Sequence, residues 1–299
     1  MAVRFAVLAS GSGGNAAVVE AGGAGVLIDL GLGPRALAKR LASVGGSWET
    51  LGAAVLTHTH GDHVRDATLA EMARRGVALY CHEGHRRTLG WSAGFATLDR
   101  GGLVRHYDER PFLLPTGARV EPVELSHDGG PTFGFRVEAA ASRRGRASAI
   151  GYVADTGCWS EPMADALADV DLLGVEFNHD VPMQLRSGRS PHLIRRNLGD
   201  GGHLSNEQGA GLVAAVLGRS RPGTVKHVVL LHLSRQCNRP ALALKVARGA
   251  LLEAGWRSTV HAAEQHAATP DVSVVAARRR ASARSKSTTA AAGGFPWEV

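Results

Sequence analysis

The sequence predicts a layered α/β domain. Short apolar runs of strand length alternate along the chain with longer segments whose apolar residues recur at helical spacing. At 299 residues the chain is long enough to bury a substantial core. Its 44% hydrophobic and 20% charged residues are typical of a soluble globular protein. No linker divides residues 1–275, so we expect one large folded domain there.

The elements are expected in a regular order. Apolar runs bounded by glycine or polar residues are typical of buried strands, and segments with apolar residues three and four apart are typical of helices. By these criteria the strands fall at residues 3–9, 16–21, 25–30, 53–56, 78–81, 103–107, 119–125, 133–138, 149–154, 172–177 and 227–231. The longer helices fall at residues 34–44, 65–75, 161–168, 206–217 and 239–254, and Ser205 is expected to cap the fourth of them.

Positive charge is concentrated at the C-terminal end. The chain has a formal net charge of +7, and residues 276–299 hold five arginine or lysine residues against one glutamate. This segment lacks periodicity and is rich in Arg, Ser, Thr, Ala and Gly, which predicts a disordered basic tail. A basic balance is compatible with phosphate-rich partners, but a solvated tail explains much of it equally well.

Cysteine usage and hydropathy indicate the compartment. Cys81, Cys158 and Cys237 are widely separated and form no C-x-x-C pattern, so free thiols in a reducing compartment are expected. No apolar stretch approaches the roughly 20 residues of a membrane span, and the N-terminal residues show no signal-peptide pattern. We therefore expect a cytoplasmic protein without a membrane partner.

Four potential metal ligands follow the fourth predicted strand, in the run HTHGDH at residues 58–63. Side chains two apart at a strand end point the same way, so His58 and His60 can bind one ion. Asp62 and His63, at the following turn, can reach a second ion. A solvated histidine-rich turn is the alternative, but loops between strands and helices commonly carry function. The run predicts a two-metal centre that needs further ligands from other strand ends.

The pattern His-x-His-x-Asp-His after a hydrophobic strand resembles the signature of the metallo-β-lactamase superfamily. Asp29, in the segment IDLG at residues 28–31, resembles the acidic strand end of that family. The resemblance covers nearly all of residues 1–275 and implies an αββα four-layer sandwich. By family order it implies three further ligands, each after an apolar strand: His127, Asp155 and His232. The implied allocation places His58, His60 and His127 on one ion and Asp62, His63 and His232 on the other, with Asp155 bridging.

The ligand set implies hydrolysis without a protein nucleophile. Two divalent ions about 3.5–4 Å apart lower the pKa of a bridging water and supply hydroxide at neutral pH. Imidazole and carboxylate ligands suit Zn²⁺ and Mn²⁺ alike. Six histidines outside this context are expected to be surface or structural residues: His82, His85, His106, His192, His261 and His266.

Four further segments resemble the YycJ-like branch of the superfamily, whose members are nucleases related to tRNase Z and RNase J. They are residues 10–15, 176–180, 202–206 and 232–235. The first segment departs from the usual form at Gly13, where a second serine is usual, and Cys237 stands where a polar residue is more usual. The resemblance implies a metal-dependent phosphodiesterase acting on nucleic acid, specifically a 5′-to-3′ DNA exonuclease. RNase J carries a large inserted domain, for which this chain has no room between Asp155 and His232.

The resemblance also implies roles for residues around the metals. In tRNase Z a glutamate and a histidine assist departure of the leaving group, and Glu176 and His203 are placed comparably here. A supporting role behind the metal ligands is the alternative for both residues. The Gly/Ser loop at residues 10–15 either binds phosphate or is an ordinary turn. The residues expected to contact substrate are Ser12, Asn15, Asn178, His179 and Arg235.

Four arginines follow the 176–180 segment: Arg186, Arg189, Arg195 and Arg196. They are expected either to track a nucleic-acid backbone or to lie on a solvated helix face.

Two other functions remain open: a small-molecule ester, thioester or lactone hydrolase with the same metal site, and a non-catalytic binding or regulatory protein. Spacing does not choose between DNA and RNA, and it is compatible with a homodimer.

Overall fold

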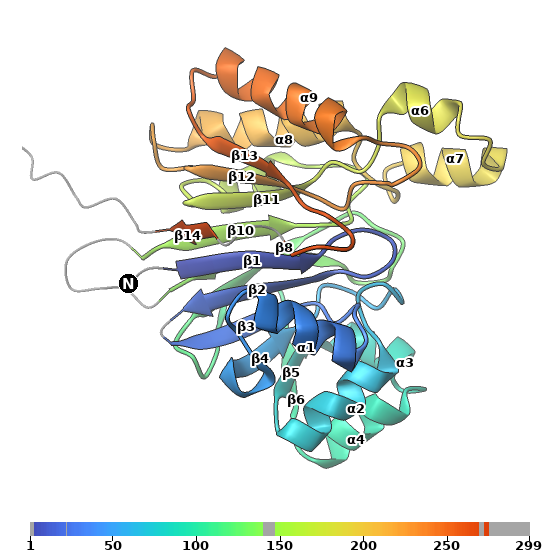
Figure 1. The fold of residues 1–299 in the computed structure, drawn as a ribbon, viewed down its shortest axis with the longest axis vertical. Helices are drawn as coiled ribbons and strands as arrows, with labels where there is room; N and C mark the ends of the chain where they lie inside the picture. The colour runs from blue at the N-terminus through green and yellow to red at the C-terminus, as the bar shows by residue number, and fades with distance from the viewer. Residues whose placement is uncertain (1–2, 22, 140–146, 269–271, 275–299) are drawn as a thin grey trace, which may run out of the picture.

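The computed structural model describes residues 3–21, 23–139, 147–268 and 272–274. Over these residues the chain forms two seven-stranded sheets, which lie face to face with helices on both outer faces (Figure 1). The expected αββα four-layer sandwich is therefore confirmed. The basic tail predicted at residues 276–299 lies outside the described residues.

The first sheet has the strand order β14-β1-β2-β3-β4-β5-β6. Strands β3 to β6 are parallel neighbours, so they all end at the same edge of the sheet. The strands are β1 (Val3–Ala9), β2 (Ala16–Ala21), β3 (Ala24–Ile28), β4 (Leu51–Val55), β5 (Ala78–His82), β6 (Val104–Tyr107) and β14 (Val272–Val274). The α-helices of this half are α1 (Pro34–Ser43), α2 (Asp66–Arg75), α3 (Arg86–Leu89) and α4 (Ala93–Arg100).

The second sheet has the order β13-β12-β11-β10-β9-β8-β7. Strands β10 to β13 are parallel neighbours. The strands are β7 (Phe112–Leu113), β8 (Arg119–Glu124), β9 (Phe133–Glu138), β10 (Ala149–Val153), β11 (Leu172–Glu176), β12 (His227–Leu231) and β13 (Thr259–Ala262). The helices are α5 (Glu161–Ala166), α6 (Val181–Leu185), α7 (Pro191–Leu198), α8 (Asn206–Arg219) and α9 (Pro240–Glu253). Helices α6 and α7 project beyond the sandwich at one end (Figure 1).

The core consists of three apolar layers, as alternating strand side chains require. Between the sheets, Phe5 and Tyr152 are fully buried and meet edge to face with ring centroids 6.4 Å apart. Leu37 and Leu69 belong to the layer under the helices of the first sheet, and Val213 belongs to the layer under those of the second. Each fully buried Leu, Phe or Val contributes roughly 1.5–3 kcal/mol to folding.

Most predicted elements agree with the structure to within two residues at each end. Ser205 caps α8 as expected, because its Oγ accepts a hydrogen bond of 3.2 Å from the backbone N–H of Gln208. The three cysteines are free thiols, as predicted. The sequence prediction missed α3, α4, β7, β13 and β14, which are short or lie at sheet edges. Among the described residues, every helix is too short or too polar to cross a bilayer.

Candidate metal centre

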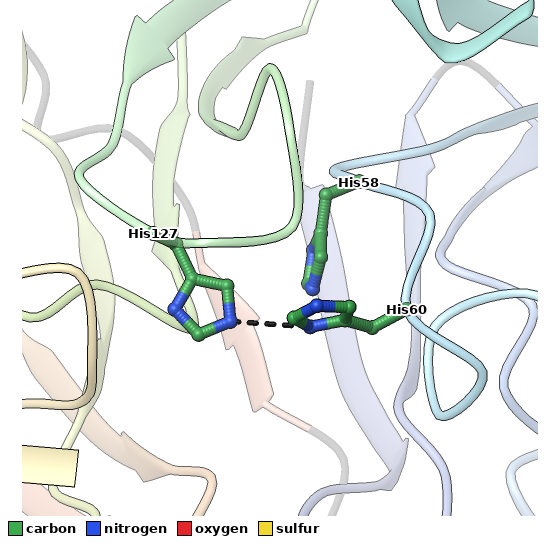
Figure 2. A group of neighbouring side chains, drawn as sticks. All are labelled: His58, His60 and His127. Carbon is green, nitrogen blue, oxygen red and sulfur yellow. Dashed lines mark hydrogen bonds between the residues drawn. The ribbon is translucent and has the colours of Figure 1, made fainter. Parts of the chain in front are cut away.

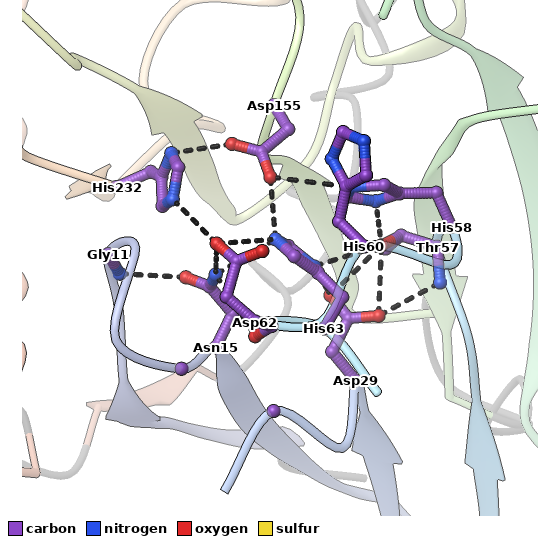
Figure 3. Close-up of polar contacts among 12 residues, drawn as sticks. Gly11, Asn15, Asp29, Thr57, His58, His60, Asp62, His63, Asp155 and His232 are labelled. Carbon is purple, nitrogen blue, oxygen red and sulfur yellow. Dashed lines mark hydrogen bonds and ion pairs between the residues drawn. The ribbon is translucent and has the colours of Figure 1, made fainter. Parts of the chain in front are cut away.

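Residues from both sheets meet at one edge of the sandwich, where the five strands named below end. Asp29 follows β3 and the run 58–63 follows β4 in the first sheet. In the second sheet, His127, Asp155 and His232 follow β8, β10 and β12. The carboxyl ends of parallel strands share one edge of a sheet, which is where α/β proteins place their sites. Figure 3 shows the side chains of His63, Asp155 and His232, from three of these loops, pointing toward one another.

Three of these strand-end residues have a left-handed backbone. The φ angles are 64° at Asp29, 59° at Asp155 and 54° at His232. Non-glycine residues seldom adopt this region, which costs of order 1–3 kcal/mol each and persists where the surrounding structure enforces it. The left-handed turn carries the chain sharply away from the strand, so the side chain stays at the sheet edge.

The first cluster is His58, His60 and His127, whose ligand nitrogens all lie within 4.8 Å of one another (Figure 2). Nδ1 of His127 donates a 2.8 Å hydrogen bond to the carbonyl of Gly202, which leaves Nε2 facing His60 at 3.2 Å. Nδ1 of His58 lies 3.0 Å from the hydroxyl of Thr57, which leaves Nε2 directed at the cluster. Three imidazole nitrogens are thus free to face one ion.

The second cluster is Asp62, His63, Asp155 and His232, again with ligand atoms within 4.8 Å of one another (Figure 3). One carboxylate oxygen of Asp155, Oδ2, lies 2.5 Å from Nε2 of His63 and 3.6 Å from Nε2 of His58. Nε2 of His232 lies 3.5 Å from a carboxylate oxygen of Asp62. Asp155 therefore lies between the two clusters and touches both.

Two buried nitrogens in these clusters lack any hydrogen-bond partner: Nε2 of His58 and Nε2 of His232. Buried polar atoms are normally paired, so each such exception requires a physical explanation. A divalent ion provides one, because mixed imidazole and carboxylate ligands at close range are the donor set that Zn²⁺ and Mn²⁺ prefer. The residues therefore fit divalent metal ions.

Asp29 and Thr57 form hydrogen bonds that orient the histidines of both clusters. Nδ1 of His63 donates to Asp29 at 2.8 Å, which directs Nε2 of His63 toward Asp155. Asp29 also accepts 2.9 Å hydrogen bonds from the backbone N–H and the hydroxyl of Thr57. A carboxylate behind a ligand histidine fixes its tautomer and orientation. The prediction included Asp29 but missed Thr57, which was signalled only by its position between strand and motif.

The Gly/Ser loop contributes a buried amide to the same site. Asn15 is fully buried, and its Nδ2 lies 2.8 Å from Nε2 of His63 and 3.3 Å from Asp62. Its Oδ1 accepts a 2.8 Å hydrogen bond from the backbone N–H of Gly11, which closes the loop. Ser12, by contrast, is exposed. Asn15 therefore lies against the metal ligands, and the substrate contact expected for it stays a prediction.

Glu176 and His203 form a hydrogen-bonded pair beside the second cluster. Nδ1 of His203 donates to Glu176 at 2.8 Å and lies 3.4 Å from Asp155. The other oxygen of Glu176 accepts from the backbone N–H groups of Thr156 at 2.9 Å and Leu204 at 3.3 Å. Glu176 is fully buried, whereas the side chain of His203 is 12% exposed. His203 is thus the more accessible of the two, and Glu176 contacts both His203 and, at 3.1 Å, Nδ1 of His232.

The charge balance of the site favours a bound cation. Burial disfavours charged imidazole, but the carboxylates of Glu176 and Asp155 outweigh it and raise the pKa of His203 to about 9. Asp29 and Asp155 likewise overcome burial and raise the pKa of His63 to about 10. Burial and the neighbouring His63 hold the pKa of His58 well below its usual value. Without metal, protonated imidazoles balance the negative charge of these carboxylates. A divalent ion that binds the imidazole nitrogens must displace those protons.

The other predicted substrate residues lie in different surroundings. Asn178 is 6% exposed and donates a 2.9 Å hydrogen bond to the carbonyl of His232. His179 is fully buried, and neither of its ring nitrogens has a hydrogen-bond partner. Arg235 is exposed, with Nη1 3.2 Å from Nε2 of His266. Of these three residues, Arg235 is the one whose side chain a large substrate can reach in this conformation.

The arginines of the α6–α7 segment also differ from one another. Arg186 and Arg195 are exposed, and Arg189 donates a 3.0 Å hydrogen bond to Gln236. Arg196 binds both carboxylate oxygens of Asp128, each at 2.6 Å. Arg196 thus already has a carboxylate partner, whereas contact of these arginines with a nucleic-acid backbone stays a prediction.

Comparison with known proteins agrees with the fold and the motif. The family described as beta-lactamase superfamily domain matches residues 25–233. The exodeoxyribonuclease WalJ of Streptococcus pneumoniae is 32% identical over 244 residues, which are 80% of this chain and 85% of the relative. The exodeoxyribonuclease YycJ of Bacillus anthracis is 30% identical over 258 residues, 86% and 92% of the two chains.

A solved structure shares the architecture at lower identity. The metallo-β-lactamase fold protein YhfI from Bacillus subtilis superposes with a TM-score of 0.63 at 15% identity, covering 90% of this chain and 99% of the YhfI chain. The two-sheet fold, the HxHxDH run and the match over most of the chain lead to one conclusion. The chain belongs to the metallo-β-lactamase superfamily and is similar within it to the WalJ and YycJ proteins.

Proposed function

We propose that this metal-dependent hydrolase is a dinuclear phosphodiesterase that degrades DNA from the 5′ end. The observation that carries the proposal is the joining of two ligand clusters through Asp155, with the Glu176–His203 pair at their side. WalJ and YycJ are named as exodeoxyribonucleases, and we transfer that substrate class to this chain as part of the proposal. The 5′-to-3′ direction rests on the resemblance to the YycJ-like branch.

Seven residues would hold the ions. His58, His60 and His127 would bind the first, Asp62, His63 and His232 the second, and Asp155 would bind both. When bound, the ions supply a nucleophile at neutral pH and stabilise the charge that develops on the phosphate. Asp29 holds His63 in the orientation that this requires, and the amide of Asn15 donates to the carboxylate of Asp62.

His203 is assigned as the proton donor to the leaving oxygen. Its Nδ1–H is committed to Glu176, so Nε2 is the ring atom that can give a proton away. A leaving alkoxide departs poorly without a proton, and a positioned general acid contributes about 10²–10⁴-fold in rate. Glu176, being buried, is a positioning residue: it fixes the tautomer of His203 and raises its pKa.

Substrate contact is assigned to exposed groups around the centre. Ser12, Arg186, Arg195 and Arg235 are exposed, and arginines that neutralise phosphates give binding that weakens with salt. Nucleic acid is then the partner of this face of the protein. The cytoplasmic location and a homodimer remain predictions.

The test is product analysis with the metal-loaded protein beside an Asp62→Ala/His63→Ala variant. End-labelled single- and double-stranded DNA and RNA are incubated in parallel with a thioester and a lactone. Mononucleotide release from the 5′ end of DNA, lost in the variant, is the expected result. Turnover of the thioester or lactone with intact nucleic acid would retain the metal site and assign the chain to small-molecule hydrolysis.

A further inference from the structure

A carboxylate outside the ligand set lies next to the first cluster. Asp128 follows His127 directly, and its Oδ1 lies 3.7 Å from Nε2 of His60 and 3.7 Å from Nε2 of His127. Two ligand atoms bound at about 2.0–2.2 Å to one tetrahedral ion lie about 3.3–3.6 Å apart. The carboxylate of Asp128 is therefore nearly close enough to join these histidines on a single ion.

Arg196 holds this carboxylate in place. Nε and Nη2 of Arg196 each donate a 2.6 Å hydrogen bond to a different oxygen of Asp128, in the bidentate arrangement typical of a strong ion pair. The remaining nitrogen, Nη1, lies 3.3 Å from the side-chain oxygen of Asn197. Both oxygens of Asp128 and all three nitrogens of Arg196 are thus already engaged.

The backbone around the pair fixes where Arg196 can reach. Arg196 belongs to α7, and the loop that follows α7 packs on the loop of Asp128. The backbone N–H of Asp128 donates to the carbonyl of Gly201 at 3.2 Å, and His127 donates to Gly202 at 2.8 Å. Two backbone-anchored contacts and the ion pair therefore hold the end of α7 against the first cluster.

We propose that Arg196 keeps Asp128 from becoming a ligand of the first ion. Three histidines and the shared Asp155 would make four ligands, so substrate or water would enter as a fifth, and a catalytic metal site needs that position to stay open. A free carboxylate at this distance would fill that position and compete with the scissile phosphate. Because Arg196 binds both oxygens of Asp128, this carboxylate stays near the ion as a negative charge without coordinating it. This inference rests on the proposed metal centre and concerns its coordination number.

The engagement of Arg196 argues against a direct role in binding DNA phosphate. A guanidinium that contacts phosphate in two places would have to release Asp128 first. Release would free the carboxylate beside His60 and His127, so phosphate binding by Arg196 would promote the ligation that blocks the site. Arg195, exposed on the same helix, has no such conflict.

The experiment measures Zn²⁺ affinity by competition with a chromophoric chelator, without nucleic acid, and kcat on DNA separately. The variants are Arg196→Ala, Asp128→Asn and their double variant. The matched control is Arg86→Ala, which removes an arginine that donates to both carboxylate oxygens of Asp99 outside the site. Arg196→Ala should bind Zn²⁺ about tenfold more tightly, since a freed carboxylate adds a ligand, and should lose about tenfold in kcat. Asp128→Asn and the double variant should bind Zn²⁺ within about twofold of the parent, and the double variant should recover kcat.

Each other outcome overturns the proposal. Unchanged Zn²⁺ affinity in Arg196→Ala means that Asp128 does not reach the ion when released. Tight binding that persists in the double variant means that the lost positive charge, and not the carboxylate, causes the effect. Weaker binding in Asp128→Asn alone means that Asp128 is a ligand in the parent protein. Because Zn²⁺ affinity is read without DNA, these outcomes stand even if the chain proves inactive on nucleic acid.

Discussion

Nδ1 of His203 donates a 2.8 Å hydrogen bond to the carboxylate of Glu176, and two backbone N–H groups fix that carboxylate from the other side. The pair comes from two different loops: Glu176 ends β11, and His203 precedes α8. A buried acid that orients an accessible imidazole is the arrangement that a proton donor needs, because it sets both the tautomer and the proton affinity.

The first prediction concerns this pair. Replacing Glu176 with Gln keeps the size of the side chain but removes the charge that raises the pKa of His203, so kcat should fall about 10²-fold or more. The kcat of His203→Ala should fall at least as far, and the kcat of the double variant should equal that of His203→Ala alone. Single-turnover DNA hydrolysis measures the effect. Glu207→Gln, at an exposed glutamate of α8, is the control; equal losses in Glu176→Gln and this control would contradict the pairing.

The second prediction separates support from substrate binding at Asn15. Asn15→Ala removes the amide beside Asp62 and His63, so metal affinity should fall about 10–100-fold, as for other groups that orient ligands. The KM for DNA at saturating metal should stay within about threefold. Titration with Zn²⁺ and steady-state kinetics give the two quantities. Ser12→Ala, on the exposed part of the same loop, should change the KM for DNA and leave metal affinity unchanged. If Asn15→Ala instead changes KM and leaves metal affinity unchanged, Asn15 contacts the substrate.

The third prediction concerns metal and stability. The ligands come from both sheets, so a bound ion would add a direct link between loops of the two sheets. Ligand that binds only the folded state stabilises it by about 2.7 kcal/mol at one hundred times Kd. The melting temperature should therefore rise with Zn²⁺ and fall with chelator. The Asp62→Ala/His63→Ala variant should show a much smaller rise, and an equal rise in both proteins would place the bound zinc elsewhere.

The fourth prediction concerns pH and His85, which is away from the metal centre. Burial lowers the pKa of His85 to about 4. The neutral ring satisfies both nitrogens, since Nε2 donates to the carbonyl of Pro131 at 2.8 Å and Nδ1 accepts from the backbone N–H of His82 at 3.3 Å. The unfolded chain takes up the proton near pH 6.5, so stability is complete above that value. It should decline by roughly 3 kcal/mol as the pH falls toward 4.

Urea unfolding across this range measures the decline. His85→Gln keeps a donor and an acceptor but cannot titrate, so its stability should depend less on pH between 6.5 and 4. His192→Gln, at an exposed histidine of α7, should retain the parent's pH dependence. A parallel decline in the parent and in His85→Gln would assign the effect to other groups.

The sequence predicted what local spacing and strand periodicity determine. The HTHGDH run and the strand-end positions of His127, Asp155 and His232 were foreseen, and the structure brings them together. The edge strands β7, β13 and β14 were missed, because two to four residues carry too little periodicity to distinguish a strand from a loop.

Contacts between distant segments were beyond sequence reasoning. Ser10 accepts a 2.7 Å hydrogen bond from the backbone N–H of His232, 222 residues away, and nothing near either residue signals it. The partnership of Asp128 with Arg196 spans 68 residues, and the sequence around neither residue predicts it. Such pairs depend on how loops from different strands pack, which only the folded chain defines.

The left-handed backbone at Asp29, Asp155 and His232 has a consequence for how this protein can change. Glycine would relax the chain at each of these positions, and proteins commonly gain stability at the expense of function when strained active-site residues are replaced. Glycine there would, however, remove a side chain from the site. Each of these three side chains therefore lies at the sheet edge at a backbone cost that glycine would avoid.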